Sequence, residues 1–337
     1  MRLLTASMLA AVAGIVALPA AADPVADFYK GRTITITAAS GAGGGYGVYA
    51  MLIREHLGKY IPGNPNVIVS YNPGGGGTVA ADQAYHVSAK DGTAVLAPLQ
   101  SMATLQLVGK VGIRYDASKF QWIGRAAETT SGFVVHSNVA NSLDVLLARK
   151  EEMIVGVTQP GAPNHILAAL LRYCPGVKMK LVSGYKGSPP LALAFQRNEV
   201  DGLALPLDSL RLVYKDILKQ SMIAQSGLSR ARDFPDVPLA VDLCKDPEKR
   251  KVLEFFQVQE EMGRSYALPP GTPADRVAAL RKAFDEVMKD PALLATARQR
   301  RLDINPLSGN KVQQLIGGHI ATDSAQVAIA KTAVGLQ

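Results

Sequence analysis

The chain has 337 residues, 48% of them hydrophobic, and a formal net charge of +8. That length is enough for one large domain or two ordinary ones. The positive surplus suits an anionic ligand, although an ordinary solvated surface can carry it as well, and no run of Lys and Arg alternates with aromatic residues. We therefore exclude nucleic acid as a partner.

Residues 1–22 have the pattern of a secretory signal peptide. Arg2 supplies the N-terminal charge, an apolar run extends from Leu3 to Leu18, and Ala20-Ala21-Ala22 offers a small-residue cleavage site. The apolar run is too short for a spanning helix, and no later run of apolar residues reaches the ~18 that one requires. We therefore expect an exported mature protein.

A glycine-rich loop follows the first predicted strand. Residues 33–37 alternate Thr and Ile, which predicts a strand, and apolar Ala50, Ile53, Leu57 and Tyr60 predict a helix after the loop 41–47. Glycine lets a backbone approach a ligand, and the unpaired N–H groups at a helix N-terminus favour a carboxylate or phosphate. The loop indicates an anion site, but such loops often only make a tight turn.

The strand–loop–helix pattern recurs twice before residue 103. Val67–Tyr71 and Thr93–Pro98 are the predicted strands, and residues 72–78 and 99–102 are the loops after them. Repeated units of this kind predict a mostly parallel sheet with crossover helices. Ligands of such sheets lie beyond the carboxyl ends of the strands.

A second set of units begins near residue 153. Its predicted strands are Met153–Thr158, Lys178–Ser183 and Val200–Leu205, and its first loop is Gln159–Asn164. Two further strand candidates lie where the chain would cross between the halves: Trp122–Gly124 and Gly132–Val135. The sequence therefore predicts an α/β protein with two halves.

The last third of the chain reads as helical. Thr272 with Pro273 behind it predicts a capped helix start, and an apolar stripe follows at Val277, Leu280, Phe284 and Val287. Asp290-Pro291 separates this helix from the next. A final helix is predicted from about residue 310 to the C-terminus, and all of these helices are expected to pack on the core.

The sequence offers little support for a metal site or a catalytic residue. The five histidines never stand at i, i+4, no cysteine cluster exists, and neither a G-x-S-x-G elbow nor a Walker or kinase motif occurs. Cys174 and Cys244 could pair in an oxidising compartment, but 70 residues separate them and spacing alone cannot show that they are close. We predict no metal, no cofactor and no enzymatic activity.

A secreted nucleotide-dependent enzyme is the less favoured alternative. Residues 45–50 match G-x-G-x-x-A between a strand and a helix, as a dinucleotide site requires. However, the second strand ends in Ser70-Tyr71-Asn72, which provides no acid to hold a ribose.

Four stretches together resemble the receptors of tripartite tricarboxylate transporters, the Bug-type periplasmic binding proteins. These are Phe28-Tyr29-Lys30-Gly31 with the strand and glycine loop behind it, Asn72–Thr78 with Asp91-Gly92, Gly161–Leu171 with Gly184–Pro190, and Leu268–Pro273. Each is weak alone, but their order and spacing behind a signal peptide are specific.

The resemblance implies a two-lobed type 2 periplasmic binding protein fold, with two Rossmann-like lobes joined by two crossover segments. Lobe 1 would comprise residues 23–131 plus 264–337, and lobe 2 residues 132–263. It further implies a monomer in the periplasm that captures a small organic acid and delivers it to the membrane permease subunits. A sensor component with the same fold is the alternative.

The resemblance also maps ligand contacts onto this chain, and His165 is added because it stands at a helix start beside the second loop. These candidates are Gly43, Gly44, Gly45 and Tyr46 in the first loop, Gln100 and Ser101, Gly161, Ala162, Pro163, Asn164 and His165 in the second loop, and Asp208 and Ser209. One departure stands out, because the family often has aspartate where this chain has Gly47, and Tyr46 replaces a small polar residue. Tyr46 would either select a ligand with an apolar body or pack between the lobes.

Overall fold

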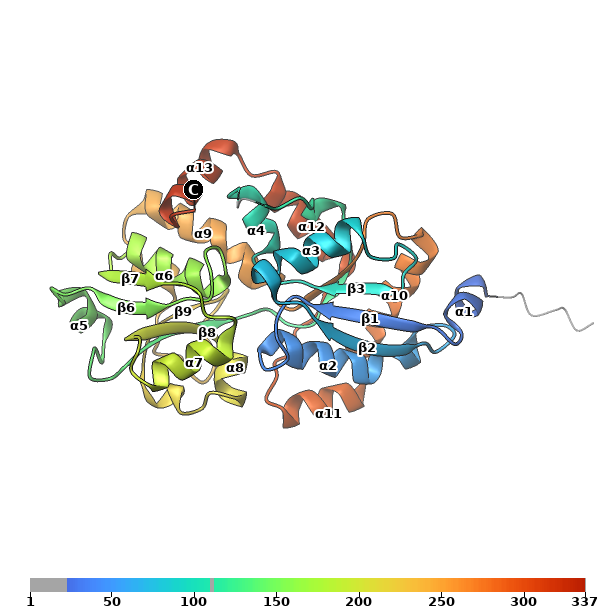
Figure 1. Ribbon diagram of the computed structural model, residues 1–337, viewed down its shortest axis with the longest axis horizontal. Helices are drawn as coiled ribbons and strands as arrows, with labels where there is room; N and C mark the ends of the chain where they lie inside the picture. Colours follow the sequence, from blue (N-terminus) through green and yellow to red (C-terminus); the bar gives the residue numbers. More distant parts are fainter. Residues whose placement is uncertain (1–22, 110–111, 337) are drawn as a thin grey trace, which may run out of the picture.

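The computed structural model describes residues 23–109 and 112–336 (Figure 1). The predicted signal peptide lies outside these ranges. Within them, no helix is both long and apolar enough to pass through a bilayer. The chain forms two β-sheets, each covered by helices, so the predicted α/β class is confirmed.

The first sheet has the strand order β11-β4-β10-β3-β1-β2. β1 is parallel to both β2 and β3, whereas β10 is antiparallel to β3 and β4, and β11 is antiparallel to β4. The Thr/Ile alternation of β1 buries Ile34 and Ile36 completely, as period-2 patterning requires. The strands of the first sheet are β1 (Thr33–Ala38), β2 (Asn66–Tyr71), β3 (Ala94–Ala97), β4 (Gln121–Arg125), β10 (Ser265–Leu268) and β11 (Leu307–Ser308).

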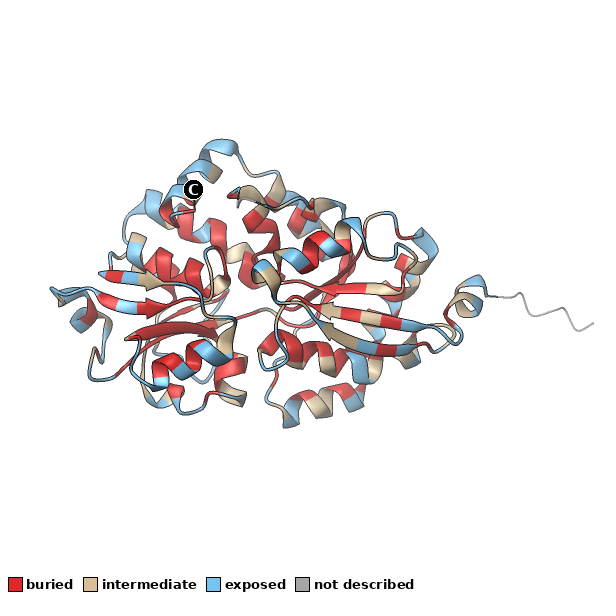
Figure 2. Ribbon diagram, viewed as in Figure 1, coloured by how far each residue is buried: buried red, intermediate tan, exposed pale blue. Residues whose placement is uncertain are grey.

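Helices cover this sheet, and each has buried residues (Figure 2), most of which are hydrophobic. The predicted stripe Val277, Leu280, Phe284 and Val287 lies in the same buried cluster as Ile34 and is confirmed as core. These helices are α1 (Pro24–Tyr29), α2 (Gly45–Leu57), α3 (Thr78–His86), α4 (Met102–Leu107), α10 (Ala274–Val287), α11 (Pro291–Gln299) and α12 (Gly309–Ile320).

The second sheet has the order β7-β6-β8-β5-β9. β6 is parallel to β7 and β8, and β5 is antiparallel to β8 and β9. Its strands are β5 (Ser131–Val135), β6 (Met153–Gly156), β7 (Met179–Val182), β8 (Gly202–Pro206) and β9 (Ser221–Ser226). Its helices are α5 (Leu143–Ala148), α6 (Pro163–Tyr173), α7 (Ser188–Gln196), α8 (Leu207–Leu212) and α9 (Pro247–Met262).

The chain crosses between the sheets twice, from β4 to β5 and from α9 to β10. The two crossing segments run side by side: Ala126 N donates to Arg264 O at 2.9 Å, Arg264 N to Ala127 O at 2.8 Å, and Thr129 N to Glu260 O at 3.0 Å. The predicted crossing between Trp122–Gly124 and Gly132–Val135 is confirmed, because β4 belongs to the first sheet and β5 to the second.

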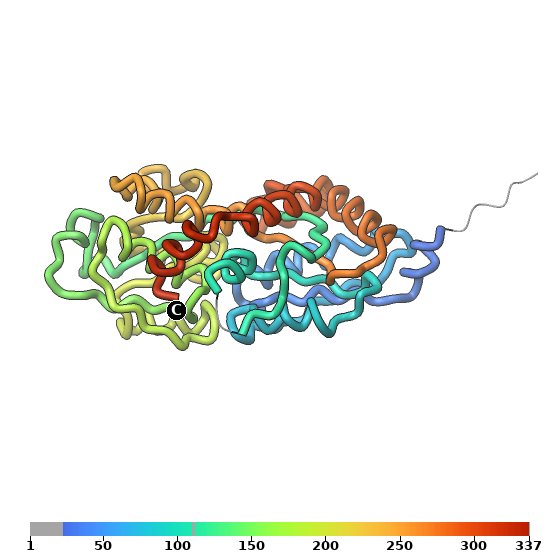
Figure 3. Tube along the Cα trace, turned by 90° about the horizontal axis from the view of Figure 1, so that it is seen from above, coloured from blue at the N-terminus to red at the C-terminus, as the bar shows by residue number. Residues whose placement is uncertain are grey.

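The C-terminal segment is two helices, so the prediction of one continuous final helix is wrong. α12 ends at Ile320 and α13 spans Ser324–Ala333. Thr322 Oγ1 donates to the His319 carbonyl at 2.7 Å, and Asp323 Oδ1 accepts from Ala325 N at 2.8 Å, so these two side chains end one helix and cap the next. Figure 3 shows this segment running from one half of the molecule across to the other.

α13 packs against α6 and α9, which accompany the second sheet. The division into residues 23–131 plus 264–337 and 132–263 stays a prediction.

Two further details correct or extend the sequence analysis. The predicted cap at Thr272 is wrong, because α10 begins at Ala274 and Thr272 Oγ1 donates instead to Pro269 O at 2.8 Å, within its own turn. Cys174 and Cys244 form a disulfide, with a Cα–Cα distance of 5.3 Å. The pairing that spacing left open is thus decided by the fold.

Candidate ligand-binding site

The first glycine loop meets the end of the second sheet at the N-terminus of α2. This helix begins at Gly45, inside the predicted loop, and its N-cap residue Gly44 has no side chain with which to bond the first turn. Gly45 N instead donates to Ser209 Oγ, 3.0 Å away on α8. Because α2 follows β1 and α8 follows β8, the carboxyl ends of strands in the two sheets face one another here.

Gly45 lies so close to this neighbouring segment that no side chain fits. A Cβ at Gly45 would lie 2.5 Å from Asp208 Oδ1 and 2.7 Å from Arg264 Nη2. Asp208 Oδ1 also accepts from Ser209 Oγ at 3.1 Å. The structure therefore brings together three predicted residues, Gly45, Asp208 and Ser209, and places the Asp208 carboxylate at the positive end of the α2 dipole.

Tyr46 and Gln100, predicted from separate loops, form a reciprocal pair. Tyr46 Oη donates to Gln100 Oε1 at 2.9 Å and accepts from Gln100 N at 3.0 Å. Burial raises the pKa of Tyr46 to about 12, so its hydroxyl keeps its proton. Gln100 follows β3 of the first sheet, so this pair lies within one half of the molecule, and both roles considered for Tyr46 stay predictions.

Arg264, which the sequence analysis missed, lies at the centre of the cluster. It is 2% exposed, and its Nε and Nη2 both donate to Asp208 Oδ2, Nε at 3.2 Å. Its Cζ lies 4.0 Å from the ring centroid of Tyr46 and 5.5 Å from that of Tyr49, within cation–π range. Burial alone would lower the pKa of Arg264, but the charge and hydrogen bond of Asp208 together with the effects of Tyr46 and Tyr49 outweigh burial and raise that pKa.

One nitrogen of the Arg264 guanidinium makes no hydrogen bond to the described residues. Within residues 23–109 and 112–336, Arg264 Nη1 has no hydrogen-bond partner although it is buried. One sequence signal could have indicated Arg264: it directly follows Gly263, the glycine that ends α9, in a crossover segment between the two halves.

Glu260, also missed, extends the cluster into α9. Its Oε2 accepts from Gln100 Nε2 at 2.8 Å, and it is 3% exposed. Burial raises the pKa of Glu260 to about 7, against the opposing effects of its hydrogen bonds and of Arg264. The chain Tyr46–Gln100–Glu260 thus connects the start of α2 to the crossover segment.

The second predicted loop is bonded mainly within itself. Asn164 Oδ1 accepts from Thr158 Oγ1 at 3.0 Å and from His165 N at 2.9 Å, and Gly161 N donates to His165 Nδ1 at 3.3 Å. Ala162 is the N-cap of α6 and Pro163 its first residue.

Outside itself, this second loop packs against α4. A Cβ at Gly161 would collide with Leu105 of α4, so this loop packs on that helix. Ser101, at the start of α4, is fully buried, and its Oγ is without a partner among the described residues. In the first loop, Gly43 lies beside Pro189 of α7, with 3.7 Å between an added Cβ and the proline Cγ, whereas Gly44 has open space around its Cβ position.

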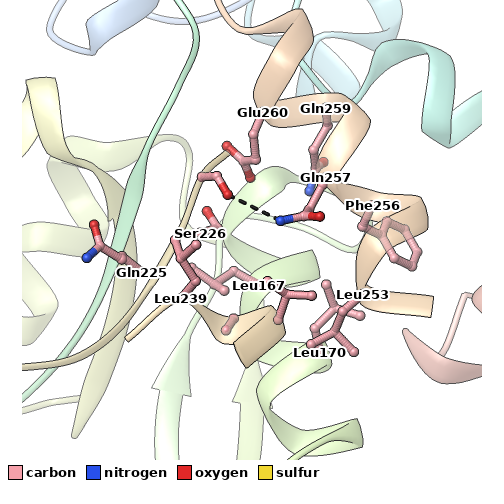
Figure 4. Close-up of a pocket in the computed structure, with 13 residues that line it drawn as sticks. Leu167, Leu170, Gln225, Ser226, Leu239, Leu253, Phe256, Gln257, Gln259 and Glu260 are labelled. Carbon is pink, nitrogen blue, oxygen red and sulfur yellow. Dashed lines mark hydrogen bonds between the residues drawn. The ribbon is translucent and has the colours of Figure 1, made fainter. Parts of the chain in front are cut away.

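A small cavity lies behind Glu260, between α6, β9 and α9 (Figure 4). Its volume is about 30 Å³, room for one or two water molecules and too little for an organic acid. Figure 4 shows Leu170, Leu253 and Phe256 in the right half of the view and Glu260 near its top. We therefore do not regard it as the ligand site. Within the described ranges, no group of His, Cys, Asp and Glu could hold a metal ion.

Known proteins are similar to this chain in sequence or in fold. No family model matches the chain. A UPF0065 protein of Bordetella bronchiseptica is 26% identical over 294 residues, which cover 85% of this chain and 81% of that protein. The solved structure of the periplasmic binding protein BugD matches 92% of this chain and 99% of its own with a TM-score of 0.72 at 18% identity. The resemblance to the Bug-type receptors is confirmed.

A third relative carries a ligand. MatC from Rhodopseudomonas palustris, solved with bound malate, matches 90% of this chain and 99% of its own, with a TM-score of 0.69 at 18% identity. Together these matches establish the two-lobed Bug-type fold for this chain.

The departure from the Bug-type pattern at Gly47 has a structural reason. A Cβ at this position would lie 2.6 Å from the carbonyl oxygen of Ala42 and 2.9 Å from that of Gly41. An aspartate, which the resemblance led us to expect there, would collide with the backbone of the loop. In this chain the polar groups near the start of α2 come instead from Tyr46, Asp208 and Arg264.

Proposed function

We propose that this protein is a periplasmic receptor that binds a small organic carboxylate between its two halves and delivers it to a tripartite-type membrane permease. It acts as a monomer and performs no chemistry on its ligand. The observation that carries the proposal is the contact of Gly45 N with Ser209 Oγ, because it joins the carboxyl ends of strands in two separate sheets around a buried cation. Ligands of open α/β sheets bind at this edge.

The chemistry of the cluster favours an anion. Backbone N–H groups at the start of α2 and the Arg264 guanidinium are donors, and the Tyr46 ring lies against that guanidinium. Binding of malate by MatC, a protein of the same fold, supports a dicarboxylate in particular. We include the other predicted residues in the proposed site: Gly43, Gly44, Gln100, Ser101, Gly161, Ala162, Pro163, Asn164 and His165.

The mechanism is closure of the halves about the two crossing segments. The backbone bonds between residues 126–129 and 260–264 hold these segments together while their ends rotate. A ligand that contacts both halves stabilises the closed arrangement by its differential affinity for it.

A thermal-shift screen of residues 23–337 tests the proposal. The panel contains malate, succinate, adipate and citrate, with neutral sugars as controls. An acid present at about a hundred times its Kd adds about 2.7 kcal/mol to the free energy of unfolding, which raises Tm by a few degrees. Folded protein freed of co-purified ligand that responds to none of the acids would contradict it. Delivery predicts that deleting the gene abolishes uptake of the acid that binds.

A further inference from the structure

The Arg264–Asp208 pair lies where the proposed ligand would bind. Asp208 lies in the first turn of α8, directly after β8 of the second sheet, and Arg264 lies in the crossing segment before β10. Their side chains are 12% and 1% exposed, respectively, so this ion pair is largely removed from water. Both contact Gly45 at the start of α2, which belongs to the first sheet.

The Asp208 carboxylate has the surroundings that an anionic ligand would need. It accepts from a guanidinium, from the Ser209 hydroxyl and from Ser209 N, and it lies at the start of the 13-residue helix α2. Each of these donors favours a carboxylate of any origin. A carboxylate of the protein and a carboxylate of a ligand would therefore compete for one position.

Arg264 also has capacity beyond its pair with Asp208. A guanidinium offers five N–H donors, and the buried Nη1 has no partner within the described part of the chain. A buried donor without a partner costs free energy, so a group that accepts from it would bind favourably there. The rings of Tyr46 and Tyr49 hold the guanidinium in place at 4.0 and 5.5 Å.

From this geometry we infer that Arg264 binds a carboxylate of the ligand, and that Asp208 competes with the ligand for Arg264 and the start of α2. The inference rests on the proposed function and adds a charged binding residue that the sequence did not indicate. It also reverses the role of Asp208, which the resemblance assigns to direct ligand contact. The two roles of Asp208 predict opposite effects of the same substitution.

The decisive variant is Asp208→Asn. It keeps the shape of the side chain and an acceptor for Ser209 but removes the competing charge. Titration calorimetry with malate, succinate and adipate should show binding about tenfold tighter than in the wild type, because a larger fraction of the protein has Arg264 available. Asp216→Asn is the matched control, since it removes an exposed carboxylate that forms an ion pair with Lys219 at the surface, and its Kd should not change.

The role of Arg264 is tested in the same background. Asp208→Asn combined with Arg264→Met removes both charges of the pair, so no buried charge is left unpaired. This double variant should bind the same acids about a hundredfold more weakly than Asp208→Asn alone. If it fails to unfold cooperatively, Asp208→Asn with Arg264→Lys replaces it; that variant keeps the charge but loses the two-pronged donor, and it should also bind more weakly.

The outcomes separate the two proposals. Weaker binding by Asp208→Asn, or equal binding by the single and double variants, overturns the inference and leaves the proposed function intact. If none of the acids binds the wild type or Asp208→Asn, the proposed function fails and the inference fails with it. Tighter binding by Asp208→Asn together with loss in the double variant establishes both.

Discussion

The guanidinium of Arg264 stacks over the ring of Tyr46, with 4.0 Å between Cζ and the ring centroid. The two residues stand 218 positions apart and come from a crossing segment and from the first turn of α2. Their contact fixes the end of the first sheet against the segment about which the halves would move. This contact should therefore both stabilise the fold and position Arg264 in the proposed site.

Substitutions of Tyr46 should separate its ring from its hydroxyl. Tyr46→Phe keeps the ring under Arg264 but leaves Gln100 Oε1 and N without the hydroxyl, which should lower the free energy of unfolding by about 1–2 kcal/mol. Tyr46→Leu removes the ring as well and should lower it further, by about 3 kcal/mol in total. Denaturant unfolding measures both. Equal losses in the two variants would mean that the ring contact contributes nothing.

Two adjacent glycines should respond differently to the same change. Gly45→Ala places a methyl group 2.5 Å from Asp208 and 2.7 Å from Arg264 Nη2, and should lower the free energy of unfolding by about 1–3 kcal/mol. At Gly44 the backbone is extended and an added methyl group has no neighbour within 4 Å. Gly44→Ala should therefore leave the free energy of unfolding nearly unchanged. Urea denaturation of the two variants makes the comparison. A Gly45→Ala protein as stable as the wild type would show that the halves are not in contact here in solution.

Glu260 should make stability depend on pH. Its pKa is raised by burial from 4.5 to about 7 in the folded protein, so between these values the folded state holds a proton that the unfolded state has released. The stability that this carboxyl contributes is present below about pH 4.5 and is lost as pH rises through about 7. Its full extent is of the order of 3 kcal/mol.

The variant Glu260→Gln isolates that effect. Unfolding free energies measured at pH 5 and at pH 8 should differ by less in the variant than in the wild type. The comparison with the wild type is needed because His319 also titrates in this range. Burial lowers the pKa of His319 to about 4, so the stability that His319 contributes falls as pH falls from 6.5 to 4, opposite to the effect of Glu260. An identical pH dependence in both proteins would show that Glu260 is ionised throughout.

The disulfide should stabilise the second half. Cys174 and Cys244 close a loop with a sequence separation of 70, and a loop of that length corresponds to about 4 kcal/mol in the chain-entropy model. The double variant Cys174→Ser with Cys244→Ser should lose about that much in denaturant unfolding. A reducing agent should destabilise the wild type to a similar degree and leave the double variant unaffected. If the reducing agent affects both proteins equally, the difference has another cause.

Local pattern determined much of the architecture. The Thr/Ile alternation of β1, the apolar stripe of α10 and the repeated strand–loop–helix units depend on periodicity, which short stretches of sequence carry in full. The order of motifs behind a signal-like segment was also enough to indicate the Bug-type resemblance. The errors in this layer were at helix ends, because Thr272 and Thr322 each bond the backbone of a nearby turn instead of following the helical pattern.

Tertiary structure decided what lies at the site. Sequence placed Gly45 with Tyr46, Gln100, and Asp208 with Ser209 on three separate segments. Only the tertiary structure showed that Gly45 meets Ser209 and that Tyr46 meets Gln100. Glu260 carried no local signal, and Arg264 carried only its place directly after Gly263, because a charged residue becomes a buried partner only through elements distant in the chain. The same holds for the pairing of Cys174 with Cys244. Periodicity is a property of neighbours in sequence, whereas charge pairing depends on neighbours in space.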